Sequence, residues 1–182
     1  MGVAENNSEL WVFAYGSLLW KPGFECLEHR HATLHGFRRR FGLSSEHYRG
    51  TPERPGLVLG LDWAPGHHCD GIAFRVCPTR DLDVRRYLSA RELVSRAYFE
   101  TVYPVSFPDG GGTDALCYIL DRAHYQYRGN LSEDEQATII AGAVGREGAN
   151  ADYLFNTVAK LGELGLPDPD LDRLAERVRA LL

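Results

Sequence analysis

The chain has 182 residues, a hydrophobic content of 44% and a formal net charge of −5 at pH 7. This length favours a single domain over residues 1–182 with a sizeable core. Because Arg and Lys are scattered along a chain that is negative overall, the composition argues against a nucleic-acid-binding protein, which needs clustered positive charge to bind phosphates.

Membrane and secreted proteins are also disfavoured classes. No segment approaches the ~20 apolar residues of a membrane helix, and residues 1–10 lack the basic start and apolar middle of a signal peptide. The four cysteines include no CxxC pair, so a disulfide framework is not indicated. We therefore expect a cytoplasmic protein with no membrane partner and no obligate protein partner.

The first two thirds of the chain are rich in predicted strands, which are runs of apolar, aromatic and β-branched residues bounded by Gly, Pro and Asp. They span residues 11–15, 32–43, 57–62, 71–77, 98–107 and 115–120. The PDGGGTD segment at 108–114 is typical of a hairpin loop.

Two polar segments within this region receive an ordinary structural interpretation. GHHCDG at 66–71 contains two His, a Cys and an Asp, but four adjacent side chains rarely all point at one metal ion, so we interpret it as a hairpin tip. The basic run GFRRRFG at 36–42 is interpreted as a solvated strand edge, with Arg39 on the opposite face from Arg38 and Arg40.

Helices are predicted between the fourth and fifth strands and after the last strand. Residues 79–94 have acidic residues in the first turn and apolar residues at helical spacing, and Asp81 is the expected N-cap. Ser132 and Glu135 have the spacing of a capping box for a helix that follows them. Residues 150–165 and 170–182 continue with amphipathic spacing.

This order of elements predicts an α+β fold, with a mixed sheet of about six strands curled into a small barrel and flanked by helices. Strands and helices do not alternate regularly, which argues against a doubly wound nucleotide-binding fold. GREG at 145–148 lacks the Lys-Ser/Thr ending and the preceding strand of a phosphate loop.

The first candidate for chemistry is the turn in WVFAYGSLLWKPGFE at 11–25, where Gly16 and Ser17 interrupt a buried strand. A Gly permits a bend in which a Cβ would clash, and successive N–H groups can then bind a carboxylate or an oxyanion. The alternative is an ordinary connecting turn. Ser17 does not lie in a G-x-S-x-G nucleophile elbow, so a serine nucleophile is poorly supported.

Glu92 is the second candidate, because it follows Leu88 by one turn and precedes two apolar residues on the predicted helix. Periodicity alone favours an exposed Glu beside Arg91. If Glu92 faces an apolar cleft instead, desolvation raises its pKa and makes it a usable general base. A thiol pair of Cys26 and His29 has no pattern that brings the two together.

Four segments together resemble the ChaC-type glutathione-specific gamma-glutamylcyclotransferase family. They are VFAYGSLLWKPGF at 12–24, RRFGLSSEHYRGTPERPGLVLGL at 39–61, YLSARELVSRAYFETVYPV at 87–105 and GREGANADYL at 145–154. The resemblance implies a β-barrel flanked by helices and a small-molecule substrate, glutathione, which is converted to 5-oxoproline and cysteinylglycine. It implies no cofactor and no metal.

The same resemblance assigns site residues. Glu92 matches the family's catalytic base. Arg49 is a candidate partner for the glycine carboxylate of glutathione, with a structural ion pair as the alternative. The expected substrate-binding residues are Ala14, Tyr15, Gly16, Ser17, Leu18, Leu19, Arg49 and Tyr98. Tyr153 is either a wall of the pocket or part of the core.

Three other functions remain open at this stage. The same ring closure can act on another gamma-glutamyl amide or amine, since the fold and the base would be unchanged. A non-catalytic module that binds gamma-glutamyl compounds is a second alternative, although the presence of Glu92 argues against it. A metal or thiol redox protein is a third, and it requires the His67–Asp70 cluster or a cysteine to be functional.

Overall fold

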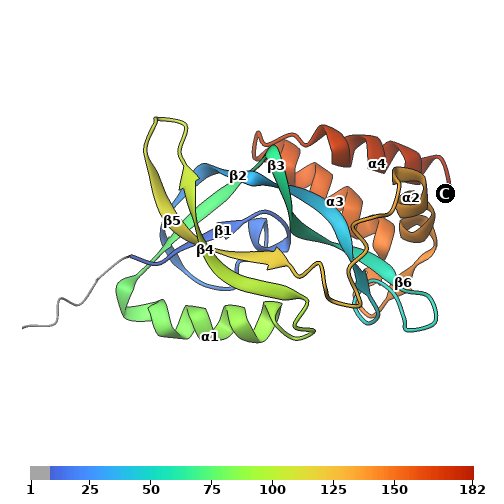
Figure 1. The fold of residues 1–182 in the computed structure, drawn as a ribbon, viewed down its shortest axis with the longest axis horizontal. Helices are drawn as coiled ribbons and strands as arrows, with labels where there is room; N and C mark the ends of the chain where they lie inside the picture. Colours follow the sequence, from blue (N-terminus) through green and yellow to red (C-terminus); the bar gives the residue numbers. More distant parts are fainter. Residues whose placement is uncertain (1–8) are drawn as a thin grey trace, which may run out of the picture.

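The computed structural model describes residues 9–182, and its centre is a closed β-barrel. Residues 1–8, most of the segment examined for a signal peptide, lie outside the described residues. The barrel strands are β1 (Trp11–Ala14), β2 (Cys26–Ser45), β3 (Gly56–Val76), β4 (Tyr98–Ser106) and β5 (Gly112–Leu120), and they close in the order β1-β3-β2-β4-β5 (Figure 1). The predicted α+β barrel is confirmed.

The long hairpin of β2 and β3 supplies most of the barrel wall, and it corrects the predicted strands. The expected strands at 57–62 and 71–77 are two parts of β3, so the hairpin tip predicted at GHHCDG is wrong. His35 pairs with His68 and Phe37 with Trp63, which places residues 64–67 opposite Gly36 alone. Because Gly36 and Gly66 have φ of 81° and 82°, the ladder absorbs the extra residues as a bulge instead of reversing.

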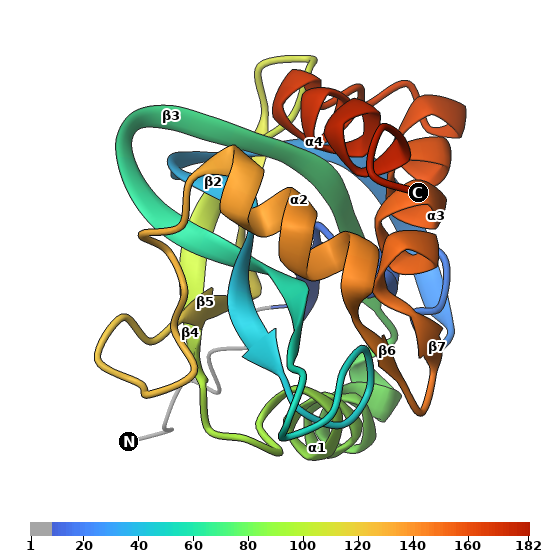
Figure 2. The same cartoon turned by 90° about the vertical axis from the view of Figure 1, so that its right-hand side faces the viewer.

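Four helices cover the barrel on two sides. Helix α1 (Asp81–Glu92) lies across the barrel from α4 (Pro169–Arg179), and α4 packs with α2 (Glu133–Gly142) and α3 (Asn150–Glu163) (Figures 1 and 2). The predicted capping box of α2 is confirmed, since Ser132 N–H donates to Glu135 and Glu135 N–H to Ser132 Oγ.

The N-terminus of α1 differs from the expectation. A short 3₁₀ turn, η2 (Pro78–Arg80), leads into α1, so Arg80 occupies the N-cap position. Asp81 is the first residue of the helix, and its Oδ1 accepts a hydrogen bond of 2.6 Å from Arg85 Nε. The predicted Asp81 cap is therefore wrong, because the η2 turn moves the start of the helix back by one residue.

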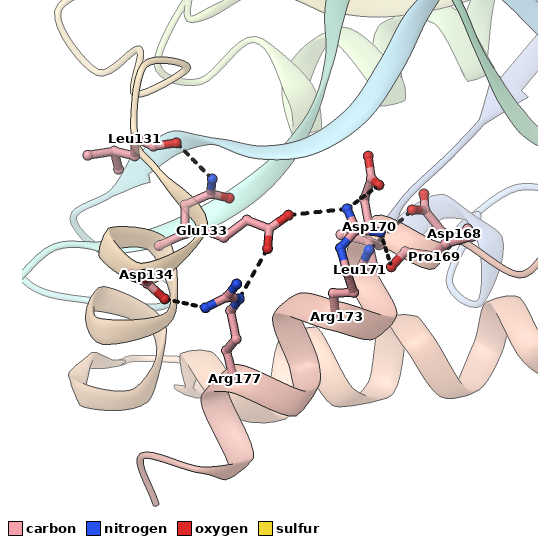
Figure 3. A network of polar contacts seen from close by, with 10 residues as sticks. Leu131, Glu133, Asp134, Asp168, Pro169, Asp170, Leu171, Arg173 and Arg177 are labelled. Atoms are coloured by element: carbon pink, nitrogen blue, oxygen red, sulfur yellow. Dashed lines mark hydrogen bonds and ion pairs between the residues drawn. The ribbon is translucent and has the colours of Figure 1, made fainter.

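Charged side chains join α2 to α4 at the surface (Figure 3). Glu133 accepts from Arg173 at 3.2 Å and from Arg177 at 3.1 Å, and Arg177 also donates to Asp134. Beneath these pairs, Leu171, Leu174 and Val178 of α4 are buried in the cluster that joins the helices to the barrel. Exposed ion pairs contribute little energy, so the apolar contacts supply most of the stability of this layer.

The core consists of two main clusters. One is drawn from strands and the residues that adjoin them, with Phe13, Leu34, Leu61 and Cys117 among its members, and it fills the barrel. The other joins Phe41 and Leu59 to all four helices. Among the described residues, no helix combines the length and the apolar character needed to cross a bilayer.

Asn150 connects α3 to β3 through a pair of buried hydrogen bonds. Its Oδ1 accepts from the Leu57 N–H at 2.6 Å, and its Nδ2 donates to the Leu57 carbonyl at 2.7 Å. The side-chain amide thus pairs with the backbone of Leu57 as a neighbouring strand would. Asn150 is fully buried, so water cannot replace these bonds.

We expect Asn150→Ala to lower the free energy of unfolding by at least about 2 kcal/mol, because it leaves a buried N–H and a buried carbonyl of Leu57 without partners. Asn156→Ala, on the exposed face of the same helix, is the matched control and should change it by less than about 0.5 kcal/mol. Urea unfolding of both variants measures the difference. Equal losses would show that Leu57 finds other partners.

Candidate functional site

A cleft of about 630 Å³ lies where β1 ends, β3 begins and α1 ends. Its walls come from the turn after β1, the end of α1, the 44–49 segment and the start of β4. Seven of the residues singled out from the sequence line it together: Tyr15, Gly16, Ser17, Leu18, Arg49, Glu92 and Tyr98. Tyr153 of α3 is also part of the lining.

Two of the expected substrate-binding residues lie elsewhere. Ala14 is the last residue of β1 and is fully buried, and Leu19 packs in the core that joins the helices to the barrel. Neither lines the cleft. Their positions support the turn from behind, because strand alternation and the 3₁₀ geometry direct them into the core.

The turn after β1 continues as a short 3₁₀ helix, η1 (Ser17–Leu19), in which the Leu19 N–H donates to the Gly16 carbonyl at 2.8 Å. Within residues 9–182, the N–H groups of Gly16, Ser17 and Leu18 donate no hydrogen bond. All three residues line the cleft. Three consecutive free N–H groups are suited to a carboxylate or an oxyanion.

Gly16 lies close to Leu59 and to Tyr153 on the cleft side of the turn. A Cβ at this position would lie 3.7 Å and 3.8 Å from Leu59 and 3.8 Å from the Tyr153 hydroxyl, which are ordinary contacts. Distant side chains therefore do not require a Gly here, and the predicted clash with the adjoining backbone stays a prediction. The small residue leaves open the space between the turn and the Tyr153 hydroxyl.

Glu92 is the last residue of α1, and its side chain is 18% exposed. Burial raises the pKa of the Glu92 carboxyl above its usual value, and the neighbouring Arg91 guanidinium opposes this increase. Periodicity had favoured an exposed Glu, and this prediction is wrong because the helix ends at Glu92 beside the cleft. The position combines partial desolvation with access to a ligand.

Arg91 is a functional candidate that the sequence analysis missed, since it mentioned Arg91 only as the neighbour of an exposed Glu92. Its Nη2 donates to Ser17 Oγ at 2.9 Å, its Nη1 donates to the Lys21 carbonyl at 2.6 Å, and its Nε lies 3.2 Å from Glu92 Oε1. Arg91 therefore joins the turn, η1 and the candidate base. Ser17 Oγ accepts a hydrogen bond here, which is a different use from that of a nucleophile.

Tyrosines form the uncharged wall around Glu92. The Tyr98 hydroxyl donates to the Leu59 carbonyl at 2.8 Å, and the Tyr15 hydroxyl donates to the Tyr118 carbonyl at 3.1 Å. Burial raises the pKa values of Tyr15, Tyr98 and Tyr153, and the nearby Glu92 charge adds to the effect. These phenols are therefore neutral near pH 7 and add no negative charge beside the carboxylate.

Arg49 lies on the far side of the cleft, between the 44–49 segment and the hairpin of β6 (Val144–Gly145) and β7 (Gly148–Ala149). Its Nη1 donates to the carbonyls of Glu147 at 2.6 Å and Ala149 at 3.4 Å. The guanidinium carbon lies 5.1 Å from the centre of the Tyr153 ring. Within residues 9–182, Nε and Nη2 donate no hydrogen bond, so Arg49 has a structural contact and spare donors.

The polar side chains of the His67–Asp70 segment do not converge on one point. His67 and His68 are exposed, whereas Cys69 is buried on the other face of β3. Over residues 9–182, no three His, Cys, Asp or Glu side chains are placed to share a metal ion. Cys26 is exposed at the start of β2.

The basic run of β2 is not a solvated edge at its centre. Arg39 is 5% exposed, and its Nε donates to the carbonyl of Tyr15, the first residue of the turn. The sequence-based interpretation is wrong for Arg39 because its acceptors come from distant parts of the chain. Arg38 and Arg40 are half-buried.

Known proteins similar to this chain were found by sequence and by structure. A family model described as ChaC-like protein matches residues 10–181. The chain is 35% identical over 178 residues to the glutathione-specific gamma-glutamylcyclotransferase of Escherichia coli (strain K12), covering 97% of this chain and 76% of that protein. It is 31% identical over 182 residues to the human glutathione-specific gamma-glutamylcyclotransferase 1, covering 94% of this chain and 78% of that protein.

Among solved structures, a yeast gamma-glutamyl cyclotransferase specific to glutathione superimposes with a TM-score of 0.86. The two chains are 25% identical, and the match covers 95% of this chain and 96% of the yeast chain.

Glu92→Gln should raise the melting temperature at pH 7, because it removes a carboxylate whose ionised form is destabilised by burial. The folded-state pKa of Glu92 is raised, so its stabilising contribution is full below the unfolded value of about 4.3 and is lost as the pH rises through the folded value. The gain from Gln should therefore vanish near pH 4 or below, about the unfolded Glu value.

Calorimetry between pH 4 and pH 8 tests this pH dependence, a range that brackets the titration of a Glu with a raised pKa (about 4.3 when unperturbed). Glu163→Gln is the control, since Glu163 is exposed at the end of α3 and pairs with Lys160. A lower melting temperature of Glu92→Gln at pH 7 would show that Arg91 fully compensates the buried charge.

Proposed function

This chain belongs to the ChaC-like protein family, and from that premise we propose that it is a glutathione-specific gamma-glutamylcyclotransferase. The reaction converts glutathione to 5-oxoproline and cysteinylglycine. The observation that carries the proposal is the placement of Glu92, a carboxyl with a raised pKa, in the same cleft as the free N–H groups of the turn.

The chemistry needs little beyond positioning and proton transfer. The substrate's α-amine attacks its own γ-carbonyl, which forms a five-membered ring and breaks the amide bond to cysteine. Glu92 takes a proton from the attacking amine and returns one to the departing amide nitrogen. A carboxyl whose pKa is raised is a stronger base when ionised and can donate a proton when protonated.

The turn supplies the anion contacts in this proposal. The N–H groups of Gly16, Ser17 and Leu18 bind the α-carboxylate of the gamma-glutamyl group and can also stabilise the developing oxyanion. Tyr98 and Tyr15 form the neutral wall that limits water around the reacting carbon. Arg91 holds the turn and Glu92 at a fixed separation through its contacts with both.

Arg49 is proposed to recognise the far end of the tripeptide. Its Nη1 is engaged by two backbone carbonyls, which fixes the guanidinium, and its other donors remain for a carboxylate. The glycine carboxylate of glutathione is the group that distinguishes it from shorter gamma-glutamyl compounds. This assignment gives the cleft one anion contact at each end of the substrate.

Glu92→Gln should lower kcat by about 10³–10⁴-fold, because it keeps the shape of the side chain and removes a group that acts in both proton transfers. KM should stay within a few-fold, since the turn and Arg49 bind the substrate. Release of 5-oxoproline, followed by chromatography, gives the rate, and Glu163→Gln is again the control.

If Glu92→Gln turns over glutathione within a few-fold of the wild type, the base is another residue. If the wild-type protein binds glutathione but releases no 5-oxoproline, the chain is a binding module. Comparing gamma-glutamyl amines under the same conditions tests the alternative substrate class.

Arg49→Ala should raise KM for glutathione by about tenfold, the loss expected for one charge-assisted contact, and should change kcat less. For gamma-glutamylcysteine, which lacks the glycine carboxylate, KM should stay within about twofold, since no such contact is lost. The melting temperature is measured in parallel, because Arg49 also holds the β6–β7 hairpin. Equal losses on both substrates would return Arg49 to a structural role.

A further inference from the structure

Arg39 is a buried charge that the proposed reaction does not use. Its side chain is 3% exposed, although it is the central residue of a basic run on β2. Each of its three nitrogen atoms donates to a separate segment: Nε to the Tyr15 carbonyl, Nη1 to Asp168 Oδ2 at 2.7 Å and Nη2 to the Asp70 carbonyl.

Asp168 is the anion of this arrangement, and it has a second task. Its side chain is 17% exposed, and its Oδ1 accepts from the Leu171 N–H at 3.2 Å as the N-cap of α4. Arg39 therefore joins the turn after β1 to β3 and to the first residues of the last helix. The acceptors lie 24, 31 and 129 residues away along the sequence.

An ion pair alone does not explain this geometry. A buried guanidinium needs hydrogen-bond acceptors around it, and two of the three segments supply backbone carbonyls. The Tyr15 carbonyl belongs to the peptide whose N–H is that of Gly16. In a trans peptide the N–H points opposite to the C=O, so an anchor on the carbonyl sets the direction of the Gly16 N–H.

The charge of Arg39 also acts through that peptide. Hydrogen bonds in a chain polarise one another, so a cation bound to the carbonyl makes the N–H on the other side a stronger donor. Gly16 lines the cleft, and its N–H has no acceptor within residues 9–182. The chain of hydrogen bonds then runs from the Arg39 guanidinium through the Tyr15–Gly16 peptide to an anion in the cleft.

We propose that Arg39 is a positioning residue that fixes and polarises the Tyr15–Gly16 peptide, so that the Gly16 N–H binds the α-carboxylate of the gamma-glutamyl substrate. This rests on the proposed function for the identity of the ligand. Arg39 itself does not touch the substrate. Asp168 is the charge partner of Arg39 and the N-cap of α4, whereas the contact that acts on the cleft is the one from Arg39 to the Tyr15 carbonyl.

Variants at two positions separate positioning from simple stabilisation. Arg39→Met removes the anchor and leaves Asp168 without its cation, so both affinity and melting temperature should fall. In Arg39→Met/Asp168→Asn the uncompensated charge is gone and Asn still caps α4, so the melting temperature should recover in part, while the Tyr15 and Asp70 carbonyls still lack their donor. The affinity should not recover, because the Tyr15 carbonyl still lacks its donor.

Two further variants complete the set. Asp168→Asn alone keeps the contact from Arg39 to Tyr15, so the KM for glutathione should stay within about twofold because only the charge on the outer partner is lost. Arg38→Met removes the preceding cation of the same strand, on its other face, and is the matched control. Arg39→Lys keeps the charge in a different donor geometry and should give an intermediate affinity.

The decisive measurement compares two ligands by titration calorimetry, with every variant made in the Glu92→Gln background so that neither ligand is consumed. The ligands are glutathione and its analogue without the α-carboxylate, 4-aminobutyryl-cysteinylglycine. Arg39→Met/Asp168→Asn should weaken glutathione binding by about tenfold and leave the analogue within about twofold, because only glutathione carries the group that Gly16 binds.

Equal weakening of both ligands, or no weakening of either, would overturn the proposal. So would unchanged affinity with a fall in kcat alone, measured in the otherwise wild-type enzyme, since that would assign the peptide to the oxyanion. Should Arg39→Met not fold, the double variant and Arg39→Lys carry the same test. Absence of turnover in the wild-type protein would defeat the proposed function, while the titrations would still decide the role of Arg39.

Discussion

Arg91 fixes the end of α1 against the turn after β1, and the geometry of the cleft depends on this contact. The guanidinium joins the two segments through Ser17 Oγ and the Lys21 carbonyl, which lie 74 and 70 residues away along the sequence. Glu92 is the next residue, so its carboxyl is held at a set distance from the turn. Apolar packing alone would allow the helix to slide, because it is not directional, whereas these hydrogen bonds define one arrangement.

The Arg91 guanidinium also limits the increase in the pKa of Glu92, the candidate base. Burial among tyrosines raises the pKa of Glu92, and Arg91 at 3.2 Å pulls it back. Without the cation, the pKa of this carboxyl would be raised further, and less of it would be in the ionised form that accepts a proton from the amine. Without burial, it would be an ordinary exposed acid and a weak base. The opposed effects leave a carboxyl whose pKa is raised by burial but whose ionised form is still supported by a cation, as a group that both accepts and returns a proton requires.

Local patterns in the sequence were sufficient for the elements that carry this chemistry. The break at Gly16, the helix that carries Glu92 and the capping box at Ser132 are all visible within short windows, because each depends on neighbouring residues, although the predicted helix ran two residues past its end at Glu92. The continuity of β3 was not visible, since a bulge at Gly66 and a chain reversal share the same turn residues. Burial of Arg39 could not be predicted either, because its acceptors come from three distant segments.

Family resemblance adds residue roles but not their contacts. It grouped Ala14 and Leu19 with the turn, whereas both lie in the core behind it. It also left open whether Arg49 binds the substrate carboxylate or has a structural role. The geometry supports both roles, since Nη1 donates to backbone carbonyls and the other donors are not engaged. A motif records which residues stand together along the chain, and only the fold decides which of their atoms face a ligand.

Three guanidinium groups also explain how a chain with a net charge of −5 can present a site for an anionic tripeptide. Arg39, Arg49 and Arg91 each donate to backbone carbonyls around the cleft. These guanidinium groups cover the carbonyl oxygens, which are the negative ends of the peptide dipoles, so the oxygens do not repel the ligand. The N–H groups of the turn remain available to bind it. The attraction for a carboxylate is therefore local, set by which ends of the peptides are covered, and it does not require a positive chain.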